Sequence, residues 1–142
     1  MDITFAVIKE RKSPPDKRVV LTPNSCLSLL KSFPSAKILI ESSDIRSYSD
    51  NDYRSIGMNV SNDMTDADIL IGVKEVPVER LIPNKSYFFF SHTIKKQPYN
   101  RKLLKAILEK KITLYDHETL VDYNYNRLIG FGYYAGVVGA YN

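Results

Sequence analysis

Two short apolar segments in the middle of the chain most constrain how it can fold. The first is residues 69–73 (Ile-Leu-Ile-Gly-Val), followed by Lys74, and the second is residues 87–90 (Tyr-Phe-Phe-Phe), followed by Ser91 and His92. Short apolar runs rich in β-branched and aromatic residues are typical of buried strands. Because these runs are apolar on both faces, they suit a parallel sheet that is covered on both sides.

The ionisable residues that end these two segments are expected to share one edge of the sheet. In open parallel sheets, ligands bind in the crevice outside the carboxyl ends of the strands. Lys74 and His92 are therefore expected side by side at the mouth of a cleft. Loss of water lowers the pKa of a lysine, and histidine titrates near neutrality. The pair is suited to acid–base chemistry, although a solvated strand end and a structural histidine are the plainer alternatives.

Strand and helix patterns alternate along the rest of the chain. Thr22-Pro23 and Ser49 are helix-start signals. Strands are predicted over residues 3–8, 36–41, 58–60, 68–73, 85–90 and 112–115, helices after Thr22, after Ser49 and over 100–111, and a hairpin over 120–129. This alternation predicts an α/β fold, a three-layer Rossmann-like (flavodoxin-like) domain with a mostly parallel sheet.

The glycine-rich segment near the end of the chain invites comparison with a dinucleotide-binding fingerprint. Residues 130–136 (Gly-Phe-Gly-Tyr-Tyr-Ala-Gly) follow a strand pattern and enter a predicted helix. However, the glycine spacing is one residue longer than the common form, and no acidic residue follows about 20 positions later. A tightly packed linker helix is therefore favoured, and no cofactor-binding residue is assigned within this chain.

Composition and charge exclude several classes of partner. The 142 residues suffice for one domain, and the net charge of +4 comes from scattered Lys and Arg without a basic stripe, which argues against nucleic acid. No apolar run reaches transmembrane length, so no membrane is expected. A lone cysteine, Cys26, and the lack of a signal segment predict the cytoplasm. His92 and His117 are the only histidines and show no metal-ligand spacing, so no metal site is predicted.

Several motifs, taken in order, resemble a known family. Residues 18–23 (Arg-Val-Val-Leu-Thr-Pro), 68–75 and 89–93 resemble the N-terminal domain shared by alanine dehydrogenase, nicotinamide nucleotide transhydrogenase and the lysine-forming saccharopine dehydrogenases. Within that group the chain is most similar to saccharopine dehydrogenase and to the lysine–ketoglutarate reductase part of aminoadipic semialdehyde synthase. The segments that carry this closer resemblance are residues 90–97, 114–118, 127, 131–132 and 135–139.

The resemblance implies a domain of a longer enzyme. Members of the family continue into a Rossmann domain that binds NAD or NADP, which this chain lacks. Residues 1–129 are thus expected to form the N-terminal substrate and catalytic domain, and residues 130–142 the truncated start of the interdomain linker helix. The implied partners are the C-terminal Rossmann domain and a small amino-acid or keto-acid substrate, and an oligomer is left open. The isolated chain is expected to bind no cofactor and to lack hydride-transfer activity.

The resemblance also implies roles for single residues. The implied reaction joins the ε-amine of lysine to the keto carbon of 2-oxoglutarate and reduces the imine with NAD(P)H. It needs cationic anchors for substrate carboxylates and a general acid and base. The matched positions are Lys74 and His92 as the acid–base pair, Glu75 and Glu118 as carboxylates that tune their pKa values, and Arg18, Lys95 and Arg127 as substrate anchors.

Two other interpretations compete with this one. The chain could be a domain of the alanine dehydrogenase or transhydrogenase type, which residues 91–97 and Arg127 fit less well. It could also be a non-catalytic small-molecule binding module that has kept the fold.

Overall fold

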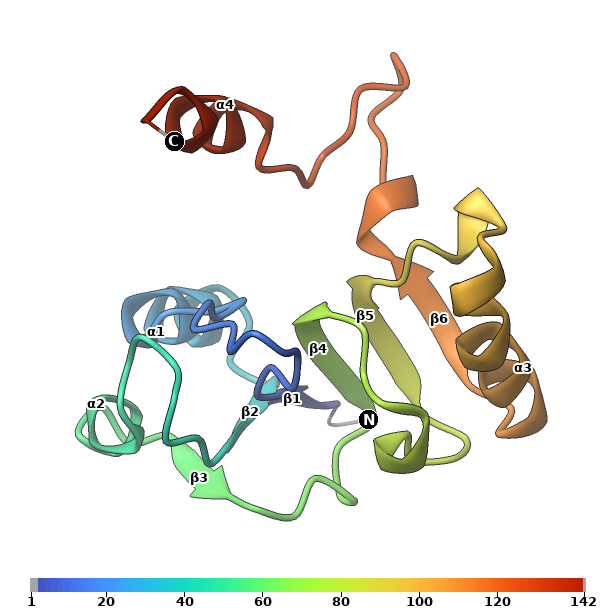
Figure 1. Ribbon diagram of the computed structural model, residues 1–142. Helices are drawn as coiled ribbons and strands as arrows, with labels where there is room; N and C mark the ends of the chain where they lie inside the picture. Colours follow the sequence, from blue (N-terminus) through green and yellow to red (C-terminus); the bar gives the residue numbers. More distant parts are fainter. Residues whose placement is uncertain (1–2, 142) are drawn as a thin grey trace.

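Six parallel strands form the centre of the molecule, in the order β3-β2-β1-β4-β5-β6 (Figure 1). The computed structural model describes residues 3–141. Residues 1 and 2 of the predicted substrate domain and residue 142 of the predicted linker helix therefore lie outside the described part. The strands are β1 (Thr4–Val7), β2 (Lys37–Glu41), β3 (Asn59–Ser61), β4 (Ile69–Lys74), β5 (Ser86–Phe90) and β6 (Thr113–Asp116).

The strand order refines the fold predicted from the sequence. The mostly parallel α/β architecture is confirmed, and β4 and β5 are neighbours inside the sheet. Among doubly wound folds this is the Rossmann order, in which the order reverses between β1 and β4, and not the flavodoxin order that the prediction named beside it. The reversal point therefore lies next to β4.

Helices cover both faces of the sheet, as a three-layer fold requires. They are α1 (Pro23–Ser32) and α2 (Asp50–Arg54) on one face and α3 (Arg101–Glu109) on the other. A fourth helix, α4 (Gly132–Tyr141), lies away from the sheet, and the short 3₁₀ turns are η1 (Val78–Arg80), η2 (Thr93–Lys95), η3 (Pro98–Asn100) and η4 (His117–Thr119). Alternate side chains of β1 enter two separate cores: Val7 packs with Cys26 of α1, while Ala6 packs with Ile107 of α3. Each face of the sheet thus has its own apolar layer.

The first two helices begin at the predicted caps. The Thr22 hydroxyl accepts a hydrogen bond from the Ser25 N–H at 3.2 Å, and Pro23 occupies the first turn. Ser49 and Asp52 form a reciprocal capping box at the start of α2. Gly57 follows α2 with a φ of +85°, a left-handed conformation that glycine adopts without strain.

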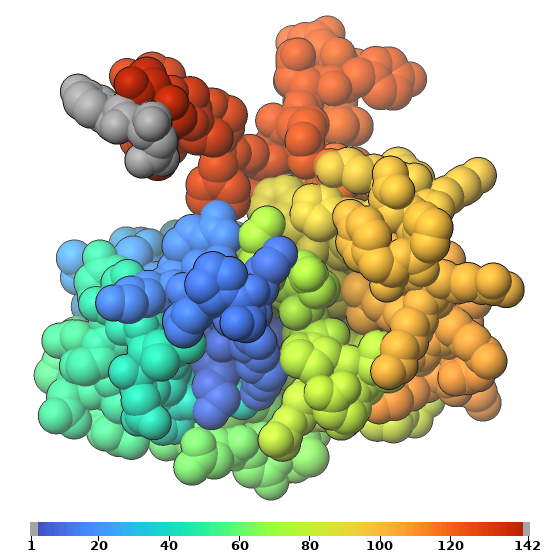
Figure 2. Space-filling view, viewed as in Figure 1, coloured from blue at the N-terminus to red at the C-terminus, as the bar shows by residue number. Residues whose placement is uncertain are grey.

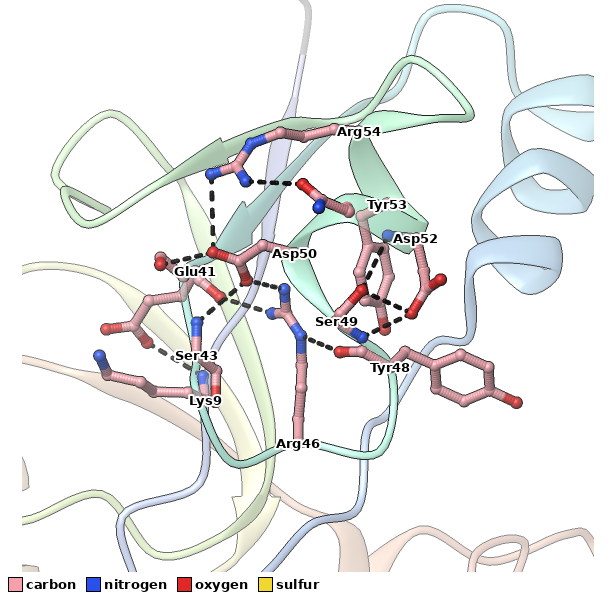
Figure 3. Close-up of polar contacts among 12 residues, drawn as sticks. Lys9, Glu41, Ser43, Arg46, Tyr48, Ser49, Asp50, Asp52, Tyr53 and Arg54 are labelled. Atoms are coloured by element: carbon pink, nitrogen blue, oxygen red, sulfur yellow. Dashed lines mark hydrogen bonds and ion pairs between the residues drawn. The ribbon is translucent and has the colours of Figure 1, made fainter.

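A buried arginine holds the loop between β2 and α2 (Figure 3). The side chain of this residue, Arg46, is only 4% exposed and forms an ion pair with Asp50. The Arg46 guanidinium also donates to the carbonyls of Glu41 at 2.6 Å and Tyr48 at 2.7 Å, and lies 4.5 Å from the centre of the Tyr53 ring. The Arg46 side chain alone contacts all of these acceptors. It therefore holds the loop in place, and its role is structural.

The last segment of the chain projects away from the sheet (Figures 1 and 2). The predicted hairpin is present in a short form, with an antiparallel bridge between Val121 and Arg127. In α4, a Cβ atom added at Gly136 or Gly139 would meet nothing within 4 Å, so the close packing expected of these residues is not made within the described chain. No helix in residues 3–141 is long and apolar enough to cross a bilayer.

Replacing Arg46 should destabilise the domain far more than replacing its neighbour Arg54. Arg46→Met removes the donor to the carbonyl of the buried Glu41 and the ion-pair partner of the partly buried Asp50, which we expect to lower the free energy of unfolding by about 3 kcal/mol. Arg54 contacts the same Asp50 at 3.6 Å but is 52% exposed, so Arg54→Met should cost less than about 1 kcal/mol. Urea denaturation of both variants tests this, and equal losses would contradict it.

Candidate functional site

The candidate site lies beyond the carboxyl ends of the strands, next to the point where the strand order reverses. Lys74 is the last residue of β4, and His92 lies two residues after β5. The loop that follows β1 carries Arg18. The adjacent parallel strands thus deliver residues distant in sequence to one edge, the position where open α/β sheets bind ligands.

Lys74 and His92 both lie beside the ring of Phe90. The Lys74 ammonium is 5.8 Å from the ring centre. The His92 and Phe90 rings are nearly parallel, with centroids 6.4 Å apart. Phe90 is only 6% exposed, so it is a fixed platform for both groups. The structure therefore brings the two residues of the predicted acid–base pair to one aromatic side chain.

Glu118 is the centre of a cluster of basic side chains. Its carboxylate lies 2.9 Å from His92 Nδ1, 3.0 Å from Lys95 Nζ and 3.5 Å from the guanidinium of Arg127. Burial alone would raise the pKa of Glu118, but the hydrogen bonds from His92 and Lys95 and the nearby positive charge outweigh it and lower the pKa. Four of the predicted residues therefore meet in one cluster.

A buried carboxylate beneath this cluster fixes its backbone. Asp116 is 7% exposed and accepts hydrogen bonds from the N–H groups of Ser91 and Glu118 and from the Ser91 hydroxyl. The Asn100 amide holds the carbonyl of His92 at 3.0 Å. His92 and Glu118 are thus tied to a common anchor. The sequence prediction missed Asp116, because an aspartate at the end of a strand carries no local sign of burial.

The ring of Phe131 lies between Arg18 and Phe90 of the candidate site. The Arg18 guanidinium is bound by Asp16, with Nε 2.9 Å and 3.1 Å from the two carboxylate oxygens. This hydrogen bond is the main reason that the pKa of Asp16 is lowered. The same guanidinium lies 4.9 Å from the centre of the Phe131 ring, which is 6.1 Å from that of Phe90. Asp16 and Phe131 were not among the predicted site residues.

Glu75 is placed differently from the other predicted residues. One of its carboxylate oxygens lies 3.6 Å from Lys12, and the other is buried without a hydrogen-bond partner among residues 3–141. Within the described part of the chain its ion pair is therefore with Lys12 and not with Lys74 or His92. The predicted pKa-tuning role of Glu75 stays a prediction.

The residues at the reversal point do not fit a dinucleotide. A Rossmann site needs a glycine-rich turn after β1 and a free acidic side chain at the end of β2. Residues 8–22 contain no glycine, and the carboxylate of Glu41 at the end of β2 is occupied by Arg11 and by the Lys9 N–H. At Gly130 and Gly132 an added Cβ would meet nothing within 4 Å, so they form no close cradle.

No metal centre was found in the described residues either. Within residues 3–141 there is no group of three or more His, Cys, Asp or Glu side chains arranged to hold a metal ion. The fold and the site together define a Rossmann-type α/β domain that carries ionisable side chains at the carboxyl edge of its sheet.

Comparison with known proteins gives the family. The family model described as "Alanine dehydrogenase/PNT, N-terminal domain" matches residues 6–138. The chain belongs to this family. It is 39% identical over 127 residues to the mitochondrial alpha-aminoadipic semialdehyde synthase of Rattus norvegicus, covering 89% of this chain and 14% of that protein. It is 34% identical over 151 residues to the saccharopine dehydrogenase [NAD(+), L-lysine-forming] of Candida glabrata, covering 99% of this chain and 38% of that protein.

Solved structures show the same fold. An L-alanine dehydrogenase superposes with a TM-score of 0.69 at 21% identity, covering 87% of this chain and 35% of the other. The transhydrogenase from Sinorhizobium meliloti superposes with a TM-score of 0.67 at 18% identity, covering 84% and 36%. The chain spans between about one ninth and two fifths of the length of the curated relatives that it matches.

The Glu118 cluster should make the domain sensitive to acid. A carboxylate whose folded-state pKa is depressed stabilises the fold above its ordinary value, here 4.5, and this stability is lost as the pH falls through the folded-state pKa. At pH 7 we expect Glu118→Gln to lower the free energy of unfolding by about 1–2 kcal/mol, because three side-chain donors lose their common acceptor. The difference from the unmodified protein should shrink below pH 4.

Urea denaturation between pH 3 and pH 7 measures this effect. The matched control is Glu109→Gln, since Glu109 is 63% exposed and pairs with Lys105 at 3.6 Å on the surface of α3. The control should differ little from the unmodified protein at any pH. A Glu118→Gln difference that persists unchanged at pH 3 would contradict the prediction.

Proposed function

We propose that this chain is the substrate-binding and acid–base domain of a saccharopine dehydrogenase-like, NAD(P)-dependent amino-acid oxidoreductase. The observation that carries the proposal is the convergence of Lys74 and His92 on Phe90, beside the cluster in which Glu118 contacts His92, Lys95 and Arg127. The relatives named for saccharopine dehydrogenase and semialdehyde synthase support the choice of reaction.

The excess of positive charge suits a substrate that carries carboxylates. Lys95 and Arg127 bring two permanent positive charges to the one negative charge of Glu118, and the side chains of both are 49% exposed. Arg18 is 40% exposed, so its guanidinium can share its hydrogen bonds between Asp16 and a ligand. A guanidinium binds a carboxylate through two parallel N–H bonds. These three residues are the proposed anchors for an amino acid and a keto acid.

His92 is the better defined member of the acid–base pair. Because its Nδ1 faces the Glu118 carboxylate at 2.9 Å, the hydrogen belongs on Nδ1 in this contact. The other ring nitrogen, Nε2, has no hydrogen-bond partner among residues 3–141 and is the proposed site of proton uptake and release. The His92 side chain is 26% exposed, which leaves it accessible to a small ligand.

Lys74 is the proposed second proton carrier. Joining an amine to a keto carbon requires removal of a proton from the amine, and loss of water requires a proton on the departing oxygen. Two titratable groups beside one platform can perform these two steps on the same substrate. Lys74 and His92 meet this requirement, since both lie within about 6.5 Å of the Phe90 ring centre.

The nicotinamide cofactor belongs, in this proposal, to a further domain. One relative is named as dependent on NAD(+), and the residues of this domain do not fit a dinucleotide. NAD(P) would accept or deliver the hydride when bound to that other domain. On this view the 142-residue chain alone binds substrate weakly and transfers no hydride.

Replacing either proton carrier should slow the complete enzyme without unfolding it. We expect Lys74→Met and His92→Gln each to lower kcat by roughly 10²–10⁴-fold, the usual effect of losing a positioned acid or base. The measurement is turnover across pH, with circular dichroism as the check on folding. Lys102→Met, an exposed substitution on α3, is the control and should leave turnover unchanged. Near-normal turnover with an unchanged pH profile would exclude the residue concerned from the acid–base role.

The isolated chain should not bind NADH or NADPH with micromolar affinity. The reason is the lack of a glycine-rich turn after β1 and the occupied carboxylate of Glu41. Titration calorimetry of the 142-residue chain with each nucleotide tests this, and a micromolar dissociation constant would overturn the assignment of the cofactor to another domain.

The reading frame beyond Asn142 separates an enzyme from a binding module. A following strand, glycine-rich turn and helix would support the oxidoreductase. A stop codon directly after Asn142 would favour the non-catalytic module that keeps the same fold.

A further inference from the structure

The end of β4 departs from a regular strand. Ile71 pairs with Phe88 of β5, but the next paired residues are Lys74 and Phe90, so β4 advances three residues where β5 advances two. One extra residue is therefore inserted in β4 immediately before Lys74. Such a bulge interrupts the ladder and re-aims the side chain that follows it, and bulges are over-represented next to active sites.

Two buried ionisable side chains bond to the backbone at this bulge. The Glu10 carboxylate accepts hydrogen bonds from the N–H groups of Val73 at 2.7 Å and Lys74 at 2.8 Å. His117 Nε2 lies 3.0 Å from the carbonyl of Gly72 and must donate there, because a carbonyl only accepts. Glu10 is 7% and His117 5% exposed. They grip three consecutive residues of β4 from two different parts of the chain.

The packing at Gly72 leaves little freedom for this backbone. A Cβ atom at position 72 would lie 3.0 Å from Ile8 Cγ1 and 3.4 Å from a carboxylate oxygen of Glu10. The end of β1 thus approaches the β4 backbone more closely than a side chain would allow. Glycine at this position lets Glu10 come within hydrogen-bond distance of the next two N–H groups.

Glu10 and His117 are ionisable side chains that lie buried at a cost in solvation. Among residues 3–141 Glu10 has no ion pair, and burial raises its pKa despite the two backbone hydrogen bonds. Burial likewise lowers the pKa of His117, whose Nδ1 has no hydrogen-bond partner in the described structure. Both residues therefore pay a desolvation penalty that ordinary apolar packing would avoid.

The contacts of Glu10 and His117 also connect them with Phe90 and Lys74 of the candidate site. His117 packs edge-on against Phe90 with ring centroids 5.2 Å apart, and the Lys74 ammonium lies 5.8 Å from the centre of that ring. Glu10 and His117 thus hold both the backbone of Lys74 and the ring beside its ammonium.

We propose that Glu10 and His117 form a clamp on the end of β4 that positions the Lys74 ammonium beside Phe90. They are positioning residues, which act on the reaction only through Lys74. The clamp matters for catalysis only if Lys74 has the role given under the proposed function, whereas its effect on the place of Lys74 is measurable without any activity.

Nuclear magnetic resonance of the isotope-labelled 142-residue chain tests the clamp. The readouts are amide hydrogen exchange at Val73 and Lys74, and the nuclear Overhauser contacts and ring-current shift between the Lys74 ε-methylene and the Phe90 ring. In Glu10→Gln one amide oxygen cannot accept both N–H groups, so exchange at these amides should accelerate by about 10- to 100-fold. The contacts with Phe90 should weaken at the same time.

The histidine is tested by a matched pair of variants. His117→Gln keeps an N–H donor near the place of Nε2 and should preserve the Lys74–Phe90 contacts, whereas His117→Phe keeps the ring without the donor and should lose them. Asp63→Asn is the control, since the Asp63 carboxylate also accepts a backbone N–H, from Thr65 at 2.9 Å, in the exposed loop between β3 and β4. It should leave both readouts unchanged.

The outcomes separate the clamp from the proposed function. If Glu10→Gln folds and keeps the Lys74–Phe90 contacts, or if the two His117 variants behave alike, the clamp is wrong. If Glu10→Gln does not fold, the histidine pair decides alone. Normal turnover of Lys74→Met in the complete enzyme would remove the proposed function and would not alter these measurements.

Discussion

Buried carboxylates hold the carboxyl edge of this sheet together. Where a parallel strand ends, its N–H groups lose their ladder partners and need other acceptors if they stay buried. Here the acceptor comes from a neighbouring strand or from the loop that follows it: Glu41 of β2 accepts from Lys9, Glu10 after β1 accepts from the end of β4, and Asp116 of β6 accepts from Ser91. Each bond joins segments at least 25 residues apart, so the edge becomes rigid only when the whole sheet has formed.

This rigidity is distributed unevenly over the candidate site. Those carboxylates hold the N–H groups of Lys74, of Glu118 and of Ser91, which precedes His92. This suits the proposed proton transfer, since that step needs groups within hydrogen-bond reach. Lys95 and Arg127, by contrast, reach the site through long side chains that are half exposed. Flexible cations are adequate for holding carboxylates, because charge attraction falls slowly with distance.

The domain also illustrates how one topology can serve different chemistry. Its strand order is that of dinucleotide-binding domains, and its candidate site lies at the same reversal point. The loop after β1, however, contains two prolines and several charged residues in place of glycines, and the acidic residue that ends β2 is bound by Arg11. The fold fixes where a ligand site forms, and the side chains at that place fix which ligand it can take.

The sequence by itself determined most of the secondary structure. Residues 69–73 and 87–90 are apolar on both faces, which only a covered sheet can bury, and Thr22 and Ser49 satisfy the first N–H groups of their helices locally. The placing of Lys74 and His92 at one edge also followed from the sequence, because parallel strands end on the same side. These inferences succeeded since each depends on neighbours within a few positions or on a general property of sheets.

Only the tertiary structure decided the partners of the site residues. In the sequence Glu10 belongs to a charged loop and His117 is simply a second histidine, yet the fold buries both against β4, 63 and 45 residues away. The sequence likewise did not predict the pairing of Glu75 with Lys12 or the contact of Phe131 with Arg18. Such contacts depend on the order of the strands and on the bulge before Lys74, and hydrophobic periodicity carries information about neither.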